Sequence, residues 1–301
     1  MSELVSEPKK PSVLTGWKAR GSFVDAEHGE VFVLDVPAVN DSGLDPILVI
    51  HGYPSCSYDW VNTLPTLSAR RRVVLMDLPG FGLSAKPDLR YSIRLYADAV
   101  ETVACEAALT SVALVTHDMG DTVGGELLAR DLEGELGFAV SERVLTNGSI
   151  YIDMAQLTNG QQFLLAADDA KLDAGWGGDG SAFQASLAAI CSPDHPPAAE
   201  DLAALWAFMS YNEGDRLLAR TIRYIEDRRA EEARFTGAIE KHPSPLGVVW
   251  GALDPVAVYP MTDKLLAARP DARRVTLEDI GHFPMLEDAS RTADAIVSLL
   301  A

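Results

Sequence analysis

The stretch of residues 111–125 constrains this chain more than any other. It opens as an apolar, β-branched run, breaks at Thr116-His117-Asp118-Met119-Gly120, and continues with apolar residues at helical spacing. The pattern predicts a buried strand, a sharp turn and a helix, and the small residues Thr116 and Gly120 allow the close backbone approach that such a turn needs. The turn holds its central side chain, Asp118, at the C-terminal edge of a sheet.

Asp118 determines which chemistry such a turn can support. A carboxylate is a poor nucleophile toward a carbonyl, but it can displace a leaving group from a saturated carbon, and water then cleaves the resulting ester. The residue type therefore points to carbon–halogen bonds or to the carbon–oxygen bonds of epoxides. The competing interpretation is a surface aspartate that follows a buried strand.

Size and charge exclude several classes of protein. The chain has 301 residues, of which 48% are hydrophobic, and this suits one domain with an insertion better than two independent domains. With 25 basic and 44 acidic residues, the net charge is −19. Because such a chain repels phosphate backbones and anionic lipids, we expect no nucleic-acid partner and no membrane partner.

The cysteines and the first residues bear on the compartment. Cys56, Cys105 and Cys191 are an odd number without metal-type spacing, which favours free thiols in a reducing environment. Residues 1–20 lack the pattern of a secretory signal, and no run of about 18 apolar residues is present. We therefore predict a cytoplasmic protein whose residues 1–20 form a disordered tail.

The order of apolar runs predicts the fold class. Runs near residues 21–25 and 31–36 indicate an antiparallel hairpin, whereas the uninterrupted runs that follow, such as 46–50 and 246–251, are typical of parallel strands buried on both faces. Strands that alternate with helical patterns indicate an α/β fold, with a mostly parallel, doubly wound sheet. Residues 150–240 are mostly helical in pattern and interrupt the alternation. They predict a lid inserted into a core of residues 21–149 and 241–301.

An ester on Asp118 requires a general base and an acid that orients it. His282 is the one histidine of six that follows a late strand, in the loop before the final helix. Asp254 ends another strand, and Pro255 restricts its backbone to an extended conformation. A helix-capping histidine and an ordinary turn aspartate are the structural alternatives. The order Asp118, Asp254, His282 is the nucleophile, acid, base order of α/β-hydrolases.

The oxyanion formed when water attacks the ester needs preorganised donors. The backbone N–H groups of Tyr53, in an early loop, and Met119, directly after Asp118, are the candidates. Asp121 lies inside the following helix, where we expect it to cap or face solvent at the first turn. We expect neither a metal nor a cofactor.

Five motifs carry a family resemblance: His51-Gly-Tyr-Pro54, Asp77-Leu-Pro-Gly-Phe-Gly-Leu-Ser84, His117-Asp-Met-Gly120, Gly251-Ala-Leu-Asp-Pro255 and Gly281-His-Phe-Pro284. Together they resemble the epoxide-hydrolase and haloalkane-dehalogenase branch of the α/β-hydrolase superfamily. The segments Ser57-Tyr-Asp-Trp60 and Tyr224-Ile-Glu-Asp-Arg-Arg229 look most like the mesoderm-specific-transcript-like hydrolases. The resemblance implies a mostly parallel, eight-stranded sheet with helices on both faces and an inserted helical lid.

The resemblance also helps to choose the leaving group. Haloalkane dehalogenases generally hold the halide with a tryptophan directly after the nucleophile, where this chain has Met119. The same position departs from the tryptophan common in epoxide hydrolases, whereas the aromatic Tyr53 is similar to what epoxide hydrolases carry. Lid tyrosines of epoxide hydrolases protonate the opening oxygen, and Tyr224 matches one of them by position. Its alternative is a residue of the helix core.

The remaining lid residues are assigned by type alone. Tyr151 and Tyr211 are the candidates for a second lid tyrosine. Substrate-pocket walls are predicted at Tyr151, Phe163, Trp206, Met209 and Tyr211, although ordinary helix packing would explain such residues equally well.

These observations favour a cofactor-independent hydrolase that opens epoxides to diols. Its partners would be a small apolar organic substrate and water, and it would act as a monomer or homodimer. A haloalkane dehalogenase that releases halide and alcohol is the first alternative. A catalytically silent binding protein with a hydrolase fold is the second, because Met119 and the missing second lid tyrosine depart from the enzyme pattern.

Overall fold

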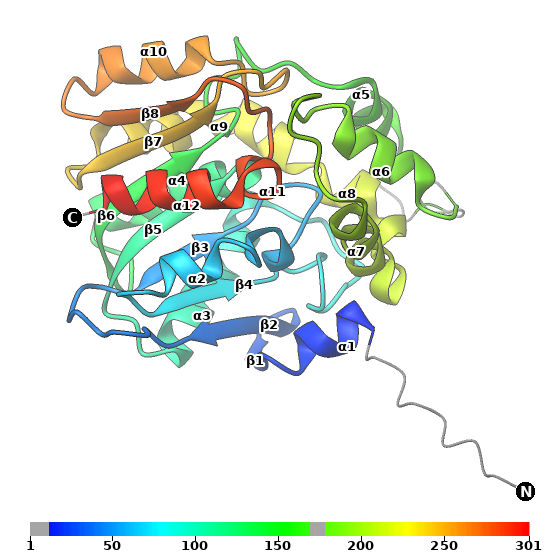
Figure 1. Ribbon diagram of the computed structural model, residues 1–301, viewed down its shortest axis with the longest axis horizontal. Helices are drawn as coiled ribbons and strands as arrows, with labels where there is room; N and C mark the ends of the chain where they lie inside the picture. Colours follow the sequence, from blue (N-terminus) through cyan, green and yellow to red (C-terminus); the bar gives the residue numbers. More distant parts are fainter. Residues whose placement is uncertain (1–11, 169–171, 173–177, 301) are drawn as a thin grey trace, which may run out of the picture.

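A central eight-stranded sheet organises the chain (Figure 1). The computed structural model describes residues 12–168, 172 and 178–300. The strand order is β1-β2-β4-β3-β5-β6-β7-β8, with antiparallel pairing of β1 with β2 and of β2 with β4, and parallel pairing elsewhere. The strands are β1 Ser22–Ala26, β2 Gly29–Val36, β3 Ile47–Ile50, β4 Val73–Met76, β5 Ser111–His117, β6 Ala139–Thr146, β7 Leu246–Gly251 and β8 Arg273–Leu277. The predicted fold class, with its edge hairpin, is confirmed.

The middle strands are buried because helices cover both faces of the sheet. Every residue of β3, β4 and β7 is buried, as the uninterrupted apolar runs predict. Helices α2 and α12 cover one face, and α3, α4 and α9 cover the other (Figure 1). The longer helices of these layers are α3 Ile93–Glu106, α4 Met119–Glu133, α9 Tyr224–Lys241 and α12 Ala289–Leu299; the shorter ones are α2 Leu64–Leu67, α10 Pro260–Ala268 and α11 Pro284–Glu287. None of the helices in the described ranges is long and apolar enough to cross a membrane.

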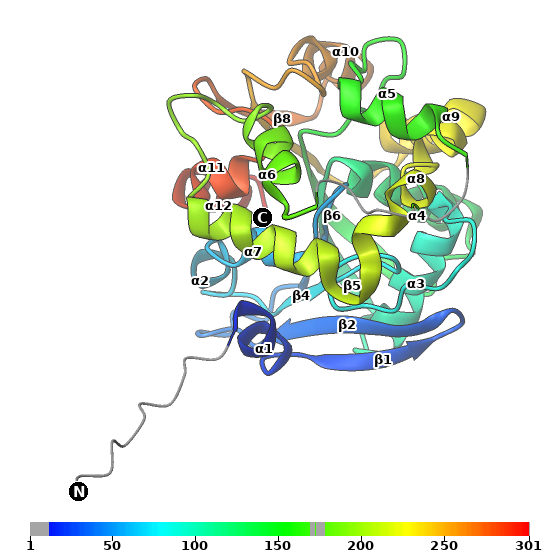
Figure 2. The ribbon, with the colours of Figure 1, turned by 90° about the vertical axis from the view of Figure 1, so that its right-hand side faces the viewer.

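The chain between β6 and β7, called here the helical insertion, breaks the strand–helix alternation. It contains α5 Asn159–Ala166, α6 Ser181–Ala188, α7 Ala199–Ser210 and α8 Leu218–Thr221 before it enters α9. Figures 1 and 2 show α5, α6, α7 and α8 gathered beyond the C-terminal ends of the parallel strands.

Helix α9 is shared between the helical insertion and the layer that covers the sheet. Its backbone leaves helical geometry at Glu231, and a Cβ on Gly125 of α4 would lie 2.7 Å from the carbonyl oxygen of Phe235. Glycine at position 125 therefore lets α4 and the second half of α9 approach closely. The range 150–240 predicted for the lid thus includes residues that pack on the core, since helical patterning cannot tell a covering helix from an inserted one.

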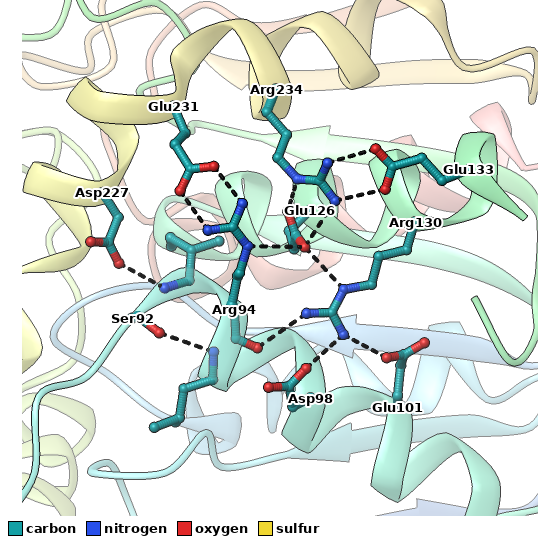
Figure 3. Close-up of polar contacts among 12 residues, drawn as sticks. Ser92, Arg94, Asp98, Glu101, Glu126, Arg130, Glu133, Asp227, Glu231 and Arg234 are labelled. Atoms are coloured by element: carbon teal, nitrogen blue, oxygen red, sulfur yellow. Dashed lines mark hydrogen bonds and ion pairs between the residues drawn. The ribbon is translucent and has the colours of Figure 1, made fainter. Parts of the chain in front are cut away.

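A buried carboxylate joins α3, α4 and α9. Glu126, only 1% exposed, accepts hydrogen bonds from Arg130 at 3.0 Å and from Arg234 at 2.6 Å, and Arg94 lies 3.9 Å away (Figure 3). Each arginine also binds a carboxylate nearer the surface: Arg94 binds Glu231, Arg130 binds Asp98 and Glu101, and Arg234 binds Glu133. The network fixes the position of α9 against the two helices under it.

The start of the chain differs from the predicted disordered tail. Residues 1–11 lie outside the described residues, but Val13–Lys18 form helix α1, capped by the Ser12 side chain. Trp17 is buried, donates a hydrogen bond to Ser57 at 3.2 Å and packs edge-on against Tyr58. One buried tryptophan orders this short helix, a tertiary contact that a polar terminal sequence does not reveal.

Candidate active site

Asp118 lies in the sharp turn between β5 and α4. Its φ of 50° and ψ of −114° are unusual for a residue with a side chain and cost of the order of 1–3 kcal/mol. A Cβ on Gly120 would lie 2.5 Å from the carbonyl oxygen of Ile50 and 2.8 Å from that of His51, so only glycine fits there. The turn therefore forces the side chain of Asp118 toward the end of the neighbouring strand β3.

The structure brings His282 and Asp254 to Asp118. Nδ1 of His282 lies 2.8 Å from Oδ2 of Asp254, and Nε2 lies 3.8 Å from Oδ1 of Asp118. All three side chains are nearly inaccessible to solvent. The first distance is that of a hydrogen bond; the second is longer than one and leaves the imidazole free to engage a water molecule.

The two oxygens of Asp118 have different surroundings. Oδ2 accepts a hydrogen bond of 2.8 Å from the backbone N–H of Tyr53. Met119 is the first residue of α4, so its N–H has no acceptor within the helix. Of the two donors predicted from the sequence, that of Tyr53 therefore binds the carboxylate, and Oδ1 is the oxygen nearer to His282.

His282 is distinguished from two other buried histidines by its charge environment. Burial opposes its protonation, but Asp254 and Asp118 outweigh burial and raise its pKa to about 9. Burial and the charge of His282 lower the pKa of His117 to about 4, and burial lowers the pKa of His51. Carboxylates favour the charged form of all three imidazoles, but only at His282 do they outweigh burial.

Two residues that position the candidate base escaped the sequence analysis. The Asn147 side chain donates a hydrogen bond to Oδ2 of Asp254 at 2.8 Å. The Glu287 carboxylate accepts backbone hydrogen bonds from Gly281 and Phe283, on either side of His282, at 2.7 and 2.9 Å. Two sequence features could have indicated them. Asn147 directly follows β6, and Glu287 lies five residues after His282 (287 − 282).

Asp121 differs from its prediction as a solvated or capping residue. It is 1% exposed, accepts a hydrogen bond of 2.5 Å from the Thr116 hydroxyl, and burial raises its pKa well above the usual range. Asp121 is therefore a core residue beneath the turn, and its burial favours the neutral carboxyl group.

A pocket of about 220 Å³ opens beside His282. Its walls come from the loop of Tyr53, from the start of α5, from α6 and from α8, and they are mainly apolar. The lining residues are Tyr53, Pro54, Thr158, Asn159, Gly160, Gln161, Leu164, Phe183, Ser186, Leu187, Ala189, Ile190, Leu218, Val256 and His282. Apart from His282, none of these side chains carries a charge near neutral pH.

The five wall residues predicted from the sequence do not line this pocket. Phe163 is 65% exposed, Trp206 packs against Phe183, and Met209 is buried in the core. Tyr151 donates a hydrogen bond to Glu240, and the ring of Tyr211 lies under the Lys86 ammonium. The helices present their neighbouring apolar residues instead, because residue type does not reveal which face of an inserted helix turns inward.

Tyr224, the predicted proton donor, lies beside Tyr53, whose backbone N–H binds Asp118. Its side chain is 1% exposed, and its ring centroid is 5.6 Å from that of Tyr53. Burial and the charge of Asp118 raise its pKa, so the phenol keeps its proton. Within the described part of the chain, no hydrogen-bond partner occupies the hydroxyl.

Comparisons with known proteins agree with this architecture. The model of the alpha/beta hydrolase family matches residues 47–295. LipZ of Mycobacterium tuberculosis is 38% identical over 288 residues, which cover 94% of this chain and 96% of that protein. The mesoderm-specific transcript protein of Mus musculus is 29% identical, with coverages of 94% and 87%.

Two further comparisons concern a named enzyme and a solved fold. A haloalkane dehalogenase of Psychrobacter cryohalolentis is 26% identical, and the match covers 85% of this chain and 83% of the enzyme. The crystal structure of an alpha/beta hydrolase fold protein from Burkholderia ambifaria superposes with a TM-score of 0.75 at 19% identity, covering 92% of this chain and 97% of that one.

Proposed function

The chain belongs to the alpha/beta hydrolase family, and we propose that it opens small apolar epoxides to diols through an alkyl ester on Asp118. The observation that carries the proposal is a carboxylate, in place of the serine of a conventional esterase, at the sharp turn after β5. Nε2 of His282 lies 3.8 Å from this carboxylate, and the Tyr53 N–H lies 2.8 Å from its other oxygen.

The two oxygens of Asp118 have different roles in the first half-reaction. Oδ1 attacks an epoxide carbon, while the Tyr53 N–H holds Oδ2 and fixes the direction of attack. The carbon–oxygen bond of the epoxide breaks, and its electron pair remains on the oxygen. Tyr224 then gives this oxygen a proton, which leaves a hydroxyalkyl ester on Asp118.

The second half-reaction uses His282 as general base. Ester formation removes the negative charge of Asp118, one of the charges that raise the pKa of His282. The imidazole can then release its proton to solvent and, once neutral, take a proton from the water molecule that attacks Cγ of Asp118. The N–H groups of Tyr53 and Met119 stabilise the oxyanion, and Asp254, held by Asn147, keeps the imidazole oriented.

The pocket supports a neutral, apolar substrate. Leu164, Phe183, Leu187 and Leu218 form much of its wall, and a volume of about 220 Å³ suits a small organic molecule. Since α5, α6 and α8 supply most of the walls, we assign the helical insertion the role of a lid that excludes water during alkylation.

A haloalkane dehalogenase is the second candidate, because one relative across 85% of the chain carries that name. A departing halide would need donor groups, yet the residue after the nucleophile is Met119, whose side chain has no N–H or O–H. The hydroxyl of Tyr224, which has no hydrogen-bond partner among the described residues, suits the oxygen of an epoxide better.

Trapping the ester tests the proposal. In the His282→Ala variant, alkylation proceeds but the base for hydrolysis is gone, so the ester accumulates. We expect mass spectrometry after incubation with styrene oxide to show one added substrate mass on the peptide that contains Asp118.

The paired assay on the unmodified enzyme distinguishes the two candidates. Phenylethanediol from styrene oxide supports the epoxide hydrolase, whereas bromide from 1-bromohexane without diol supports the dehalogenase. A trapped adduct on any other residue, or no adduct with either substrate, contradicts the Asp118 mechanism. His28→Ala, which changes a partly exposed histidine on the β1–β2 turn, is the control and should not accumulate ester.

A further inference from the structure

Arg228 is a buried cation for which the described part of the chain supplies no carboxylate partner. It lies one turn after Tyr224 on α9 and is 3% exposed. Among the residues that the structure describes, Nε and Nη1 have no hydrogen-bond acceptor, and no carboxylate lies within ion-pair distance of the guanidinium. A buried charge in this state destabilises the fold.

Other arginines of this region have at least one polar partner for the guanidinium. Arg234, two turns further along α9, binds Glu126 and Glu133. The buried guanidinium of Arg143 donates hydrogen bonds to the carbonyl oxygens of Ile239 and His242. Nε of Arg143 and of Arg220 also lack an acceptor among the described residues, but each of these guanidinium groups has another partner, the two carbonyl oxygens for Arg143 and Asp88 for Arg220. Arg228 differs because its guanidinium has neither a hydrogen bond nor an ion pair within the described ranges.

Contacts lead from Arg228 to the nucleophile. The guanidinium carbon lies 5.5 Å from the ring centroid of Tyr224, within the range of a cation–π contact. The Tyr224 ring is 5.6 Å from that of Tyr53, whose N–H binds Asp118. The charge of Arg228 thus lies next to the phenol that the proposed reaction uses as an acid.

The missing counter-charge of Arg228 would arise during the reaction. When Tyr224 gives its proton to the opening epoxide oxygen, its own oxygen becomes negative in a buried site. A nearby fixed cation stabilises such a charge more strongly than it would in water. In the resting enzyme this charge does not yet exist, which explains why the guanidinium is unpaired.

We propose that Arg228 is a positioning residue for epoxide opening, and that its guanidinium stabilises the tyrosinate which Tyr224 becomes when it protonates the leaving oxygen. The inference rests on the proposed function. Hydrolysis of the ester later releases one proton, which returns to Tyr224, so the cycle balances as epoxide plus water to diol.

The arrangement also accounts for the second lid tyrosine that the sequence lacks. Tyr151 is engaged by Glu240, and Tyr211 lies beside Lys86. The Tyr151 hydroxyl is therefore not free to share proton donation with Tyr224. A single phenol supported by a cation takes the place of two phenols.

Single-turnover alkylation by styrene oxide tests the role of Arg228. The rate of ester formation on Asp118 is followed by quench and mass spectrometry in the His282→Ala background, where hydrolysis does not interfere. Arg228→Met should slow ester formation about 30-fold, the rate factor of a desolvated cation–ring contact. Arg228→Lys keeps the charge and should stay within a few-fold of the parent. Arg229→Met, on the exposed face of the same helix, is the matched control.

Two readouts separate this role from a structural one. In a Tyr224→Phe background, Arg228→Met should have no further effect on the rate, because the phenol it supports is gone. Arg228→Met should also raise the thermal unfolding midpoint, since it removes an unpaired buried charge. A rate loss that persists without the Tyr224 hydroxyl, or a lower midpoint with an unchanged rate, would overturn the inference.

The parent variant distinguishes failure of the inference from failure of the proposed function. If His282→Ala alone forms no ester with styrene oxide, the epoxide mechanism fails, and the role of Arg228 with it. If the ester forms equally fast with and without Arg228, only the role of Arg228 is refuted.

Discussion

Replacing Asp118 with alanine is expected to lower kcat for epoxide opening by about 10⁴-fold or more, the size of effect seen when a nucleophile of a catalytic triad is removed. Asp121, the neighbouring carboxylate, cannot take over, because it is buried beneath the turn, where burial raises its pKa and disfavours the charged form. The measurement is diol formation from styrene oxide at saturating substrate.

Unfolding can be separated from loss of the nucleophile at this position. Asp118 has a φ of 50°, which glycine adopts without strain, so Asp118→Gly should be as inactive as Asp118→Ala but at least as stable toward heat. Residual turnover within tenfold of the parent in either variant would contradict the assignment of Asp118.

The same substitution should change the titration of His282. Asp118 is one of the charges that raise the pKa of His282 to about 9, so the imidazole of Asp118→Ala should lose its proton at a lower pH. NMR titration of the His282 ring measures this directly. An unchanged pKa would mean that the two groups do not interact in solution.

Glu126→Gln should give the largest loss of stability, about 3 kcal/mol in the free energy of unfolding. The substitution removes the one buried carboxylate that binds Arg130 and Arg234 and lies 3.9 Å from Arg94, so these guanidinium groups lose their shared counter-charge (Figure 3). Chemical denaturation measures the change in free energy, and the midpoint temperature of thermal unfolding should fall by several degrees.

The matched control is Glu133→Gln. This carboxylate also binds Arg234 but is 44% exposed, and exposed ion pairs contribute about 1 kcal/mol or less. Equal losses for Glu126→Gln and Glu133→Gln would mean that burial of the network adds nothing to its strength.

Much of the fold was predictable because its signals are local. The apolar runs of β3 and β7 indicated strands buried on both faces, and the small residues around Asp118 indicated a sharp turn. Parallel strands end at a common edge, so residues that follow β5, β7 and β8 were expected to meet there. The structure places Asp118, Asp254 and His282 within hydrogen-bonding or water-mediated reach of one another.

The pocket was not predictable because its walls depend on how short helices rotate. Phe163 and Leu164 are neighbours in sequence, yet the first is exposed and the second lines the pocket. Both are apolar, and an eight-residue helix gives too little periodicity to choose between them. Likewise, the burial of Trp17 depends on Ser57 and Tyr58, which no pattern within residues 1–20 could indicate.

The hydrogen bonds around Glu287 have a consequence for substrate selectivity. The backbone N–H of His282 donates a hydrogen bond to the carbonyl oxygen of Ile190, a pocket residue. The Glu287 carboxylate accepts hydrogen bonds from the backbone N–H groups of Ser192 and Gly281. If a bulky molecule displaced this side of the pocket, the displacement would therefore also turn the His282 imidazole away from the water molecule that it activates in the proposed reaction. The test is a series of 1,2-epoxyalkanes of increasing length. We expect kcat to fall along the series while KM changes little. A rise in KM at constant kcat would show that the pocket wall moves independently of His282.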